Sequence, residues 1–230
     1  MFCIPIIAKD TDEALQKMAY AKDLTDIFEI RLDLMETFNI YSIIQASPKP
    51  VLVTYRSKAE GGKGQADFPK IADYSLDAIQ AGAALVDVEL NMPEPLRQKI
   101  MDSKKSSQIV ISTHINDHTP SRLELQSIFK KSIATGADII KVVTLAVNWS
   151  DNLRVLDLVA QALDNGIKII AFCMGPRGRI SRVFSNLMGA HLTFVTLDVG
   201  QESAAGQIPI QEMKKILEYF LISSAKPNND

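Results

Sequence analysis

The sequence predicts an α/β protein: a single-domain (β/α)8 barrel, the TIM-barrel architecture, over residues 1–220, with residues 221–230 as a frayed C-terminal tail. Three observations predict it. Short apolar runs rich in β-branched residues recur along the chain, and helical patterns lie between them. Runs that are apolar throughout are typical of parallel strands buried on both faces. Eight such runs in 230 residues favour a closed barrel over an open, doubly wound sheet.

The first expected strand, Cys3–Ala8, comes from the opening apolar run MFCIPIIA, which ends at Lys9. This run has no basic residues before it and is too short for a signal peptide or a membrane-spanning helix. We therefore expect a cytoplasmic protein. The next stretch, Asp12–Lys22, has the apolar spacing of three and four that indicates an amphipathic helix.

The second expected strand, Ile27–Asp33, alternates polar and apolar residues. Glu29, Arg31 and Asp33 occupy every second position, so an extended chain would point all three to one face. The intervening apolar residues would point to the other face, against the helices. The pattern predicts a polar group inside the barrel.

The later elements repeat this order of apolar run, polar break and helical pattern. The remaining strands are expected at Pro50–Tyr55, Leu85–Glu89, Gln108–Thr113, Asp138–Leu145, Ile167–Cys173 and Leu192–Leu197, and the clearest helices at Lys70–Gln80, Ser121–Ala134 and Asn152–Asp164. The glycines at 82, 136, 166 and 189 suit the left-handed position just past a helix end. No GxGxxG follows a strand and no GxxxxGK[ST] occurs, which weighs against a nucleotide-binding open sheet.

Composition excludes several classes of function. The 25 basic and 27 acidic residues give a net charge of −2, which argues against binding of nucleic acid or a membrane surface through bulk charge. The two cysteines form no CxxC motif, so a disulfide framework or a cysteine-ligated zinc site is not expected.

In a barrel, catalytic groups lie at the carboxyl ends of the strands or on the loops that follow. Polar residues of this chain gather there: Glu29, Arg31, Asp33, Arg56, Glu60, Asp87, Glu89, His114, Arg182 and Ser203 to Gln207. Taken singly, each is weakly informative, because an inward carboxylate such as Glu29 also serves as the structural partner of an arginine. His114 and His118 are four residues apart on a strand end and a loop, which is not a helical HxxxH metal face, so no metal site is expected.

Lys141 lies in the middle of an expected buried strand, where an unpaired charge costs several kcal/mol by rough estimate. The structural reading pairs it with an inward acid such as Glu89 or Glu29. The chemical reading is that burial and nearby arginines lower the pKa of the amine, by up to roughly 3–5 units for full burial. A neutral amine that faces a ketone forms a Schiff base. His114, at comparable height on the neighbouring strand, favours the chemical reading.

Six motifs carry a resemblance to a known family: EIRLD (29–33), TYRSKAEGG (54–62), STH (112–114), DIIKV (138–142), ISR (180–182) and SAAGQ (203–207). In this order and spacing, over nearly the whole chain, they closely resemble the type I 3-dehydroquinate dehydratases, the Schiff-base dehydroquinases of the shikimate pathway of aromatic amino acid biosynthesis. The resemblance implies a (β/α)8 barrel that removes water from 3-dehydroquinate to give 3-dehydroshikimate, with no metal and no organic cofactor.

The resemblance also implies roles for single residues. It makes Lys141 the Schiff-base lysine, His114 the general acid/base and Glu60 the acid that supports this histidine. The substrate-binding residues that it implies are Glu29, Arg31 and Arg56 on the polar side of the pocket, Arg182 for the substrate carboxylate, and Ser203 and Gln207 on a lid. Ala205 stands where the family usually has proline, which puts the stiffness of the lid in doubt. Family members are often homodimers, so we expect a homodimer with a small-molecule substrate.

Two alternatives stay open. A class I aldolase is also a Schiff-base barrel, but its usual substrates carry phosphates. The only candidate phosphate loop here is the segment Gly175 to Arg179, which we interpret as a positioning loop. A non-catalytic barrel that binds sugar acids would keep the arginines but has no need for Lys141 together with His114.

Overall fold

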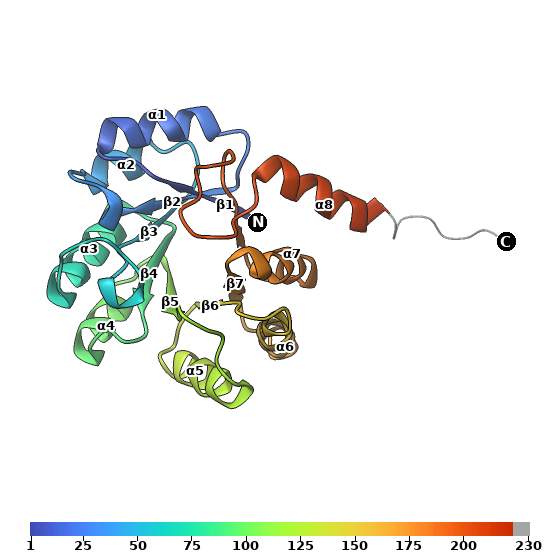
Figure 1. Ribbon diagram of the computed structural model, residues 1–230. Coiled ribbons are helices and arrows are strands. Elements are labelled where there is room, and N and C mark those ends of the chain that lie inside the picture. Colours follow the sequence, from blue (N-terminus) through green and yellow to red (C-terminus); the bar gives the residue numbers. More distant parts are fainter. Residues whose placement is uncertain (223–230) are drawn as a thin grey trace.

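The computed structural model describes residues 1–222 and confirms the predicted (β/α)8 barrel. Within this range, eight parallel strands alternate with eight α-helices, and the helices surround the strands (Figure 1). The strands are β1 (Phe2–Ile6), β2 (Ile27–Arg31), β3 (Val51–Thr54), β4 (Leu85–Glu89), β5 (Gln108–His114), β6 (Ile139–Leu145), β7 (Ile169–Met174) and β8 (Thr193–Phe194). None of the described helices is long and apolar enough to cross a membrane.

The four helices that were predicted with bounds begin and end within two residues of the predicted positions. The helices of the described residues are α1 (Thr11–Ala21), α2 (Ile40–Ala46), α3 (Phe68–Ala81), α4 (Glu94–Asp102), α5 (Arg122–Ala134), α6 (Asp151–Asp164), α7 (Arg179–Met188) and α8 (Ile210–Ile222). The four glycines expected past helix ends all have positive φ angles, between 67° and 103°. Helix α8 ends at Ile222, two residues into the segment expected as a tail. The rest of that predicted tail, 223–230, lies outside the described residues.

The sheet order is β7-β6-β5-β4-β3-β2-β1-β8, which makes a nearly closed ring with its seam between β7 and β8. Strand β8 pairs with β1 through two residue pairs only, Phe2 with Thr193 and Cys3 with Phe194. At the seam, the His191 amide donates to the Ile169 carbonyl at 2.7 Å.

Several predicted strands are too long at one or both ends, by one to three residues, and for two of them the structure shows the cause. Strand β2 ends at Arg31, because Leu32–Leu34 form a 3-10 turn. Strand β8 ends at Phe194 rather than Leu197. The Val195 amide makes a last hydrogen bond to the Cys3 carbonyl of β1. The Thr196 amide then donates to the Ile208 carbonyl and the Ile210 amide donates to the Thr196 carbonyl, so from Thr196 onward the backbone pairs with the segment before α8.

The interior of the barrel is built in layers. At the amino ends of the strands, a floor of buried apolar side chains faces inward; it consists of Cys3, Ile27, Leu52, Leu85, Val110, Ile139, Ile170 and Leu192. Because side chains alternate along a strand, the next inward layer lies two residues further on. That layer includes Glu29, Thr54, Asp87, Ser112 and Lys141, all of them buried. The polar site thus rests on a dry apolar base.

Candidate active site

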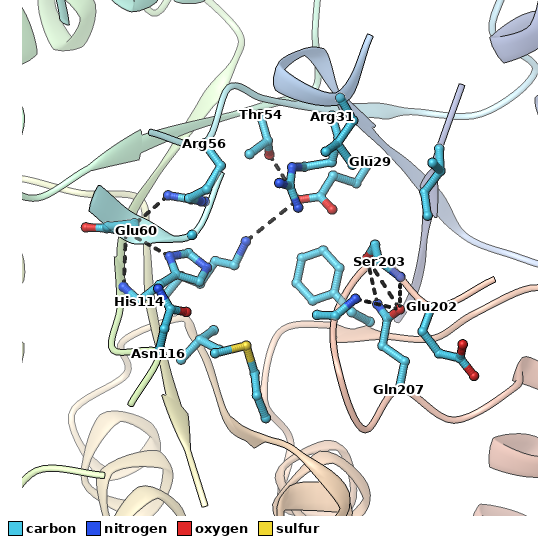
Figure 2. A pocket seen from close by; sticks show the side chains of 18 of the residues that line it. Glu29, Arg31, Thr54, Arg56, Glu60, His114, Asn116, Glu202, Ser203 and Gln207 are labelled. Carbon is cyan, nitrogen blue, oxygen red and sulfur yellow. Dashed lines mark hydrogen bonds and ion pairs between the residues drawn. The ribbon is translucent and has the colours of Figure 1, made fainter. Parts of the chain in front are cut away.

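A cavity of about 400 Å³ opens at the carboxyl ends of the strands. All of the predicted site residues line it: Glu29, Arg31, Arg56, Glu60, His114, Lys141, Arg182, Ser203 and Gln207. Figure 2 shows Arg56, Glu60 and His114 on one side of the cavity and Ser203, Glu202 and Gln207 on the other. The structure therefore brings together groups that come from six different parts of the chain.

Lys141 projects from β6 at the base of the cavity and is 3% exposed. Its Nζ donates to Asp87 Oδ2 at 3.0 Å and lies 3.7 Å from Glu29 Oε1. The ring of Phe194 lies 4.5 Å from the same nitrogen, within range of a cation–π contact. The structural reading of the sequence named Glu29 or Glu89 as the partner. Glu29 is near, but Glu89 makes no contact with the amine, and the closest carboxylate is Asp87.

Arg56 is the centre of a buried polar network. Its Nη2 donates to Asp87 Oδ1 at 2.8 Å, and its Nη1 donates to Ser112 Oγ at 2.9 Å and to Glu89 Oε1 at 3.0 Å. Burial opposes the charge of the guanidinium, but Asp87, Glu60 and Glu89 outweigh it and raise the pKa of Arg56 above its ordinary value. Much of the hydrogen-bonding capacity of Arg56 is therefore used within the protein.

The imidazole of His114 is held by Glu60. Glu60 Oε2 lies 2.9 Å from His114 Nδ1 and accepts from the His114 backbone amide at 3.0 Å and from Arg56 Nη1 at 3.3 Å. Since three groups converge on one acceptor oxygen, we infer that His114 Nδ1 carries a hydrogen and donates it. The lone pair of the other ring nitrogen, Nε2, is then free to accept a proton.

Burial shifts the pKa values of both Glu60 and His114 away from their ordinary values. Burial, together with the nearby charges of Glu89 and Asp87, raises the pKa of Glu60 to about 8 despite the opposing charge of Arg56. Burial also lowers the pKa of His114 well below its ordinary value, and the charges of Arg56 and Lys141 act in the same direction. At neutral pH the histidine is therefore uncharged, the form that a general base requires.

Replacing Glu60 with glutamine should change how stability depends on pH. The folded pKa of Glu60 is raised from 4.5 to about 8, so below pH 4.5 the carboxyl is protonated in both states and above pH 8 it is a buried charge in the folded state. The stability that the protonated carboxyl contributes is thus lost as pH rises through this window. Glutamine stays neutral at every pH. The free energy of unfolding of Glu60→Gln, relative to that of wild type, should therefore rise by on the order of 3 kcal/mol from the low-pH end of the window to the high-pH end.

Urea unfolding of both proteins at about pH 5 and about pH 8.5 measures this difference. A stability difference that stays constant with pH would show that Glu60 is an ordinary carboxylate in the folded protein. Glu13→Gln is a matched control, because Glu13 is a partly exposed carboxylate on α1 whose pKa is lowered by Lys17.

Arg31 is clamped by Asp33. Its Nε and Nη2 donate to the two carboxylate oxygens of Asp33, each at 2.7 Å. Asp33 was expected on the same strand face as Glu29 and Arg31. The 3-10 turn instead bends it back onto Arg31, and Asp33 also accepts from the backbone amides of Arg56 and Lys63, at 3.2 Å each. Asp33 therefore fixes the loop after β3 to the end of β2.

Arg182, on α7, is fully buried and stacks over the ring of Phe172 at 4.2 Å. Its Nη2 donates to the Ala205 carbonyl at 3.3 Å, while Nε and Nη1 have no hydrogen-bond partner in residues 1–222. Burial without a carboxylate partner lowers the pKa of Arg182 to about 9. Unsatisfied buried donors are costly, and an anionic ligand in the cavity would satisfy them.

The segment 200–207 covers the cavity beside Arg182. Ser203 and Gln207 bond to each other: the Ser203 amide donates to Gln207 Oε1 at 2.7 Å, and Gln207 Nε2 donates to Ser203 Oγ at 3.1 Å. The Ala205 carbonyl accepts from the Gly175 amide at 2.9 Å. Gly206 has a φ of +83°, and a Cβ there would lie 2.2 Å from the Gly175 carbonyl oxygen, so no larger residue fits.

Several lining residues were not predicted: Thr54, Lys63, Asn116, Phe172, Met174, Phe194 and Glu202. The inward alternation that identified Glu29 and Lys141 also marks Thr54, Phe172 and Met174, two or four residues beyond the apolar floor. Thr54 Oγ1 donates to Glu29 Oε1 at 3.0 Å and so orients that carboxylate. The same alternation marks Phe194, two residues beyond Leu192 of the floor, whereas Asn116 lies on the loop after β5 and the strand pattern gave no signal for it.

Comparison with known proteins agrees with this geometry. The family model described as type I 3-dehydroquinase matches residues 2–224. The bifunctional 3-dehydroquinate dehydratase/shikimate dehydrogenase of Arabidopsis thaliana is 34% identical over 95% of the chain, which covers 37% of that relative's length. The 3-dehydroquinate dehydratase of Methanococcus maripaludis strain C5 is 31% identical, with 95% of the chain and 99% of the relative covered. The crystal structure of the type I enzyme from Clostridium difficile with covalently modified comenic acid superposes with a TM-score of 0.85, at 28% identity, covering 96% of this chain and 92% of that one.

Proposed function

Because the chain belongs to the type I 3-dehydroquinase family, we propose that it is a 3-dehydroquinate dehydratase, a carbon–oxygen hydro-lyase that converts 3-dehydroquinate to 3-dehydroshikimate and water. One observation carries this proposal beyond family membership. The amine of Lys141 and the imidazole of His114 lie on adjacent strands in one cavity, and Arg182 lines the same cavity with two unsatisfied donors.

The proposed chemistry begins with Lys141. Its ammonium group gives up one proton, the amine attacks the substrate ketone, and that proton returns as the carbonyl oxygen leaves as water, so that a protonated imine remains. The imine is a better electron sink than the ketone, because removing the neighbouring proton then gives a neutral enamine instead of an enolate. The aromatic ring of Phe194 and the carboxylates of Asp87 and Glu29 surround the nitrogen on which this charge resides.

His114 is the proposed proton carrier. Its free Nε2 takes the proton beside the imine and then returns a proton to the departing hydroxyl group. Each of these roles is worth roughly 10²–10⁴-fold in rate. Glu60 keeps the ring in the tautomer that leaves Nε2 unprotonated. Hydrolysis of the conjugated imine finally releases product and regenerates the amine.

The remaining residues are proposed to bind substrate. Arg182 recognises the substrate carboxylate through its unpaired Nε and Nη1. Glu29, Arg31 and Arg56 line the polar wall that faces the substrate hydroxyls. Arg56 already donates hydrogen bonds to protein groups such as Asp87, so it has less capacity left to bind substrate. Ser203 and Gln207 complete the site from the lid.

Incubation of the protein with 3-dehydroquinate tests the proposal. Ultraviolet absorbance of the conjugated enone should rise in proportion to enzyme. An aldolase would cleave a carbon–carbon bond without producing this chromophore, and a non-catalytic binding barrel would leave the spectrum unchanged, so either result would replace the proposal. We further propose a cytoplasmic enzyme of the shikimate pathway that forms a homodimer; light scattering on the purified protein checks the mass.

The segment 200–207 is proposed to act as a lid. Val199 and Gly200 are exposed, and the hydrogen bonds that tie the segment to the barrel, from the Gly175 amide and from Arg182 Nη2, both end on the Ala205 carbonyl. Ordering a backbone costs roughly 1–2 kcal/mol per residue, so few contacts leave a low barrier to opening. Hydrogen exchange across 200–207 should slow at least tenfold when product binds. Equal exchange with and without product would make this segment a fixed wall.

Ala205→Pro should stiffen the lid. The Gln207 amide donates to the Ala204 carbonyl at 3.4 Å and Gly206 has a φ of +83°, which places Ala205 at the second position of a type II turn, where proline is favoured. The Ala205 amide donates no hydrogen bond within residues 1–222, so proline removes none. We expect two- to fivefold tighter product binding, roughly 0.4–1 kcal/mol, by isothermal calorimetry. Weaker binding would mean that the lid must flex to admit ligand.

A further inference from the structure

Asp87 lies directly beneath the cavity and contacts the reacting nitrogen from below. Its side chain is 1% exposed and is not part of the cavity lining. Oδ2 accepts from Lys141 Nζ at 3.0 Å, and Oδ1 accepts from Ser112 Oγ at 2.6 Å and from Arg56 Nη2 at 2.8 Å. Because both oxygens are engaged, the carboxylate cannot rotate away from Lys141 without breaking two other strong bonds.

The next step rests on the proposed function. When the ammonium group of Lys141 and a ketone become a protonated imine, a C–N bond forms and two of the three N–H hydrogens leave with the carbonyl oxygen as water. The positive charge and one N–H remain on the nitrogen. This cation is buried at the same place as the ammonium group, and a buried cation without a partner is strongly unfavourable.

Two carboxylates could accept the single remaining N–H. Glu29 Oε1 is 3.7 Å from the nitrogen, already accepts from Thr54, and lines the cavity, where substrate hydroxyls compete for it. Asp87 is closer and is shielded from the cavity, so a ligand cannot displace it. Burial would raise the pKa of Asp87, but the charges of Arg56 and Lys141 outweigh burial and hold that pKa below its ordinary value, so the group is a carboxylate at neutral pH.

We propose that Asp87 is the counter-ion of the protonated imine at Lys141 and retains the remaining N–H through both imine stages of the reaction. It stabilises the stages in which the nitrogen is charged: the substrate imine, and the conjugated imine that forms when the hydroxyl group, protonated by His114, leaves as water. The enamine between them is neutral and gains nothing from the carboxylate, so Asp87 sets the balance between imine and enamine.

Asp87→Asn tests this role. Asparagine keeps an oxygen for Arg56 and Ser112 but faces Lys141 with a neutral amide. Wild type and variant are mixed with saturating 3-dehydroquinate, borohydride is added during turnover, and mass spectrometry gives the fraction of the Lys141 peptide that carries an adduct. The trapped fraction and kcat should each fall roughly 100-fold. KM should change less than threefold, because Asp87 does not line the cavity; a general structural disturbance would change KM as well.

Glu89→Gln is the matched control. Glu89 lies two residues further along β4, is buried to a similar degree and also pairs with Arg56 at 3.0 Å, but it does not contact Lys141. It should keep the wild-type trapped fraction, whatever it loses in turnover. Absence of an adduct in wild type would overturn the proposed function itself. An adduct in wild type with equal trapping in Asp87→Asn and Glu89→Gln would overturn only the counter-ion role.

A second variant covers the case in which Asp87→Asn does not fold by circular dichroism. Ser112→Ala removes the hydroxyl that orients Asp87 Oδ1 and leaves both Lys141 and the charge in place. The trapped fraction should then fall roughly tenfold, because the alignment of the carboxylate weakens. Unchanged trapping in this folded variant would equally overturn the counter-ion role.

Discussion

Lys141→Ala is expected to lose turnover by roughly 10⁴-fold or more, because the proposed imine forms at this amine and the other lysine that lines the cavity, Lys63, lies on the loop after β3 rather than at the buried base. The variant should still fold. Asp87 keeps Arg56 and Ser112 as partners, and Glu29 keeps Thr54, so no carboxylate is left without a donor. Removing the amine of Lys141 also removes the free-energy cost of burying its charge.

Borohydride trapping measures the covalent step. In wild type, reduction during turnover should leave a mass adduct on the peptide that contains Lys141, and Lys141→Ala should show none. Lys63→Ala is the control, because Lys63 also lines the cavity but lies on the loop after β3, away from the buried floor. An adduct on Lys63, or on any lysine other than Lys141, would contradict the Schiff-base assignment.

His114→Ala should separate imine formation from proton transfer. Lys141 remains intact in this variant, so the imine forms, but no imidazole is left to move the proton beside it. Turnover should fall roughly 10²–10⁴-fold, and the covalent adduct should accumulate until most of the enzyme carries it. Intact-protein mass spectrometry, with substrate present and no reductant, reads this accumulation directly.

His118→Ala is the control for the second prediction. His118 is four residues further along, has a side chain that is 56% exposed and pairs with Asp117 outside the cavity. It should keep wild-type turnover without accumulating adduct. If His114→Ala turned over at the wild-type rate, His114 would have no part in the mechanism and the free Nε2 would have to be explained otherwise.

Periodicity was sufficient to predict which side chains enter the barrel. Once Ile27 and Ile139 are assigned to an apolar floor, alternation places Glu29 and Lys141 one layer higher, as the structure shows. What alternation cannot give is which groups in that layer touch. The stagger between strands determines that Lys141 reaches Asp87 rather than Glu89, and this stagger depends on how all eight strands tilt together.

The errors at strand ends have a common physical origin. The run Leu192–Leu197 is as apolar as the other strands, yet only Thr193 and Phe194 pair with β1. Beyond them the backbone finds partners in the segment before α8, which is a contact between distant parts of the loop that no local pattern encodes. In β2, Asp33 forms a bidentate pair with Arg31, and this pair favours a tight turn over continued extension.

The seam between β7 and β8 bears on how this protein is made. Strands β1 to β7 pair in the order in which they leave the ribosome, so each new strand finds its neighbour already in place. The last strand, in contrast, must cross back to Phe2 and Cys3, about 190 residues earlier in the chain. A nascent chain that has passed β7 therefore already holds Lys141 and His114 in adjacent strands, while the Phe194 ring and the Ser203–Gln207 cover are still to be added. Catalytic competence should consequently arise in a single step, when β8 and the segment that follows it close the ring.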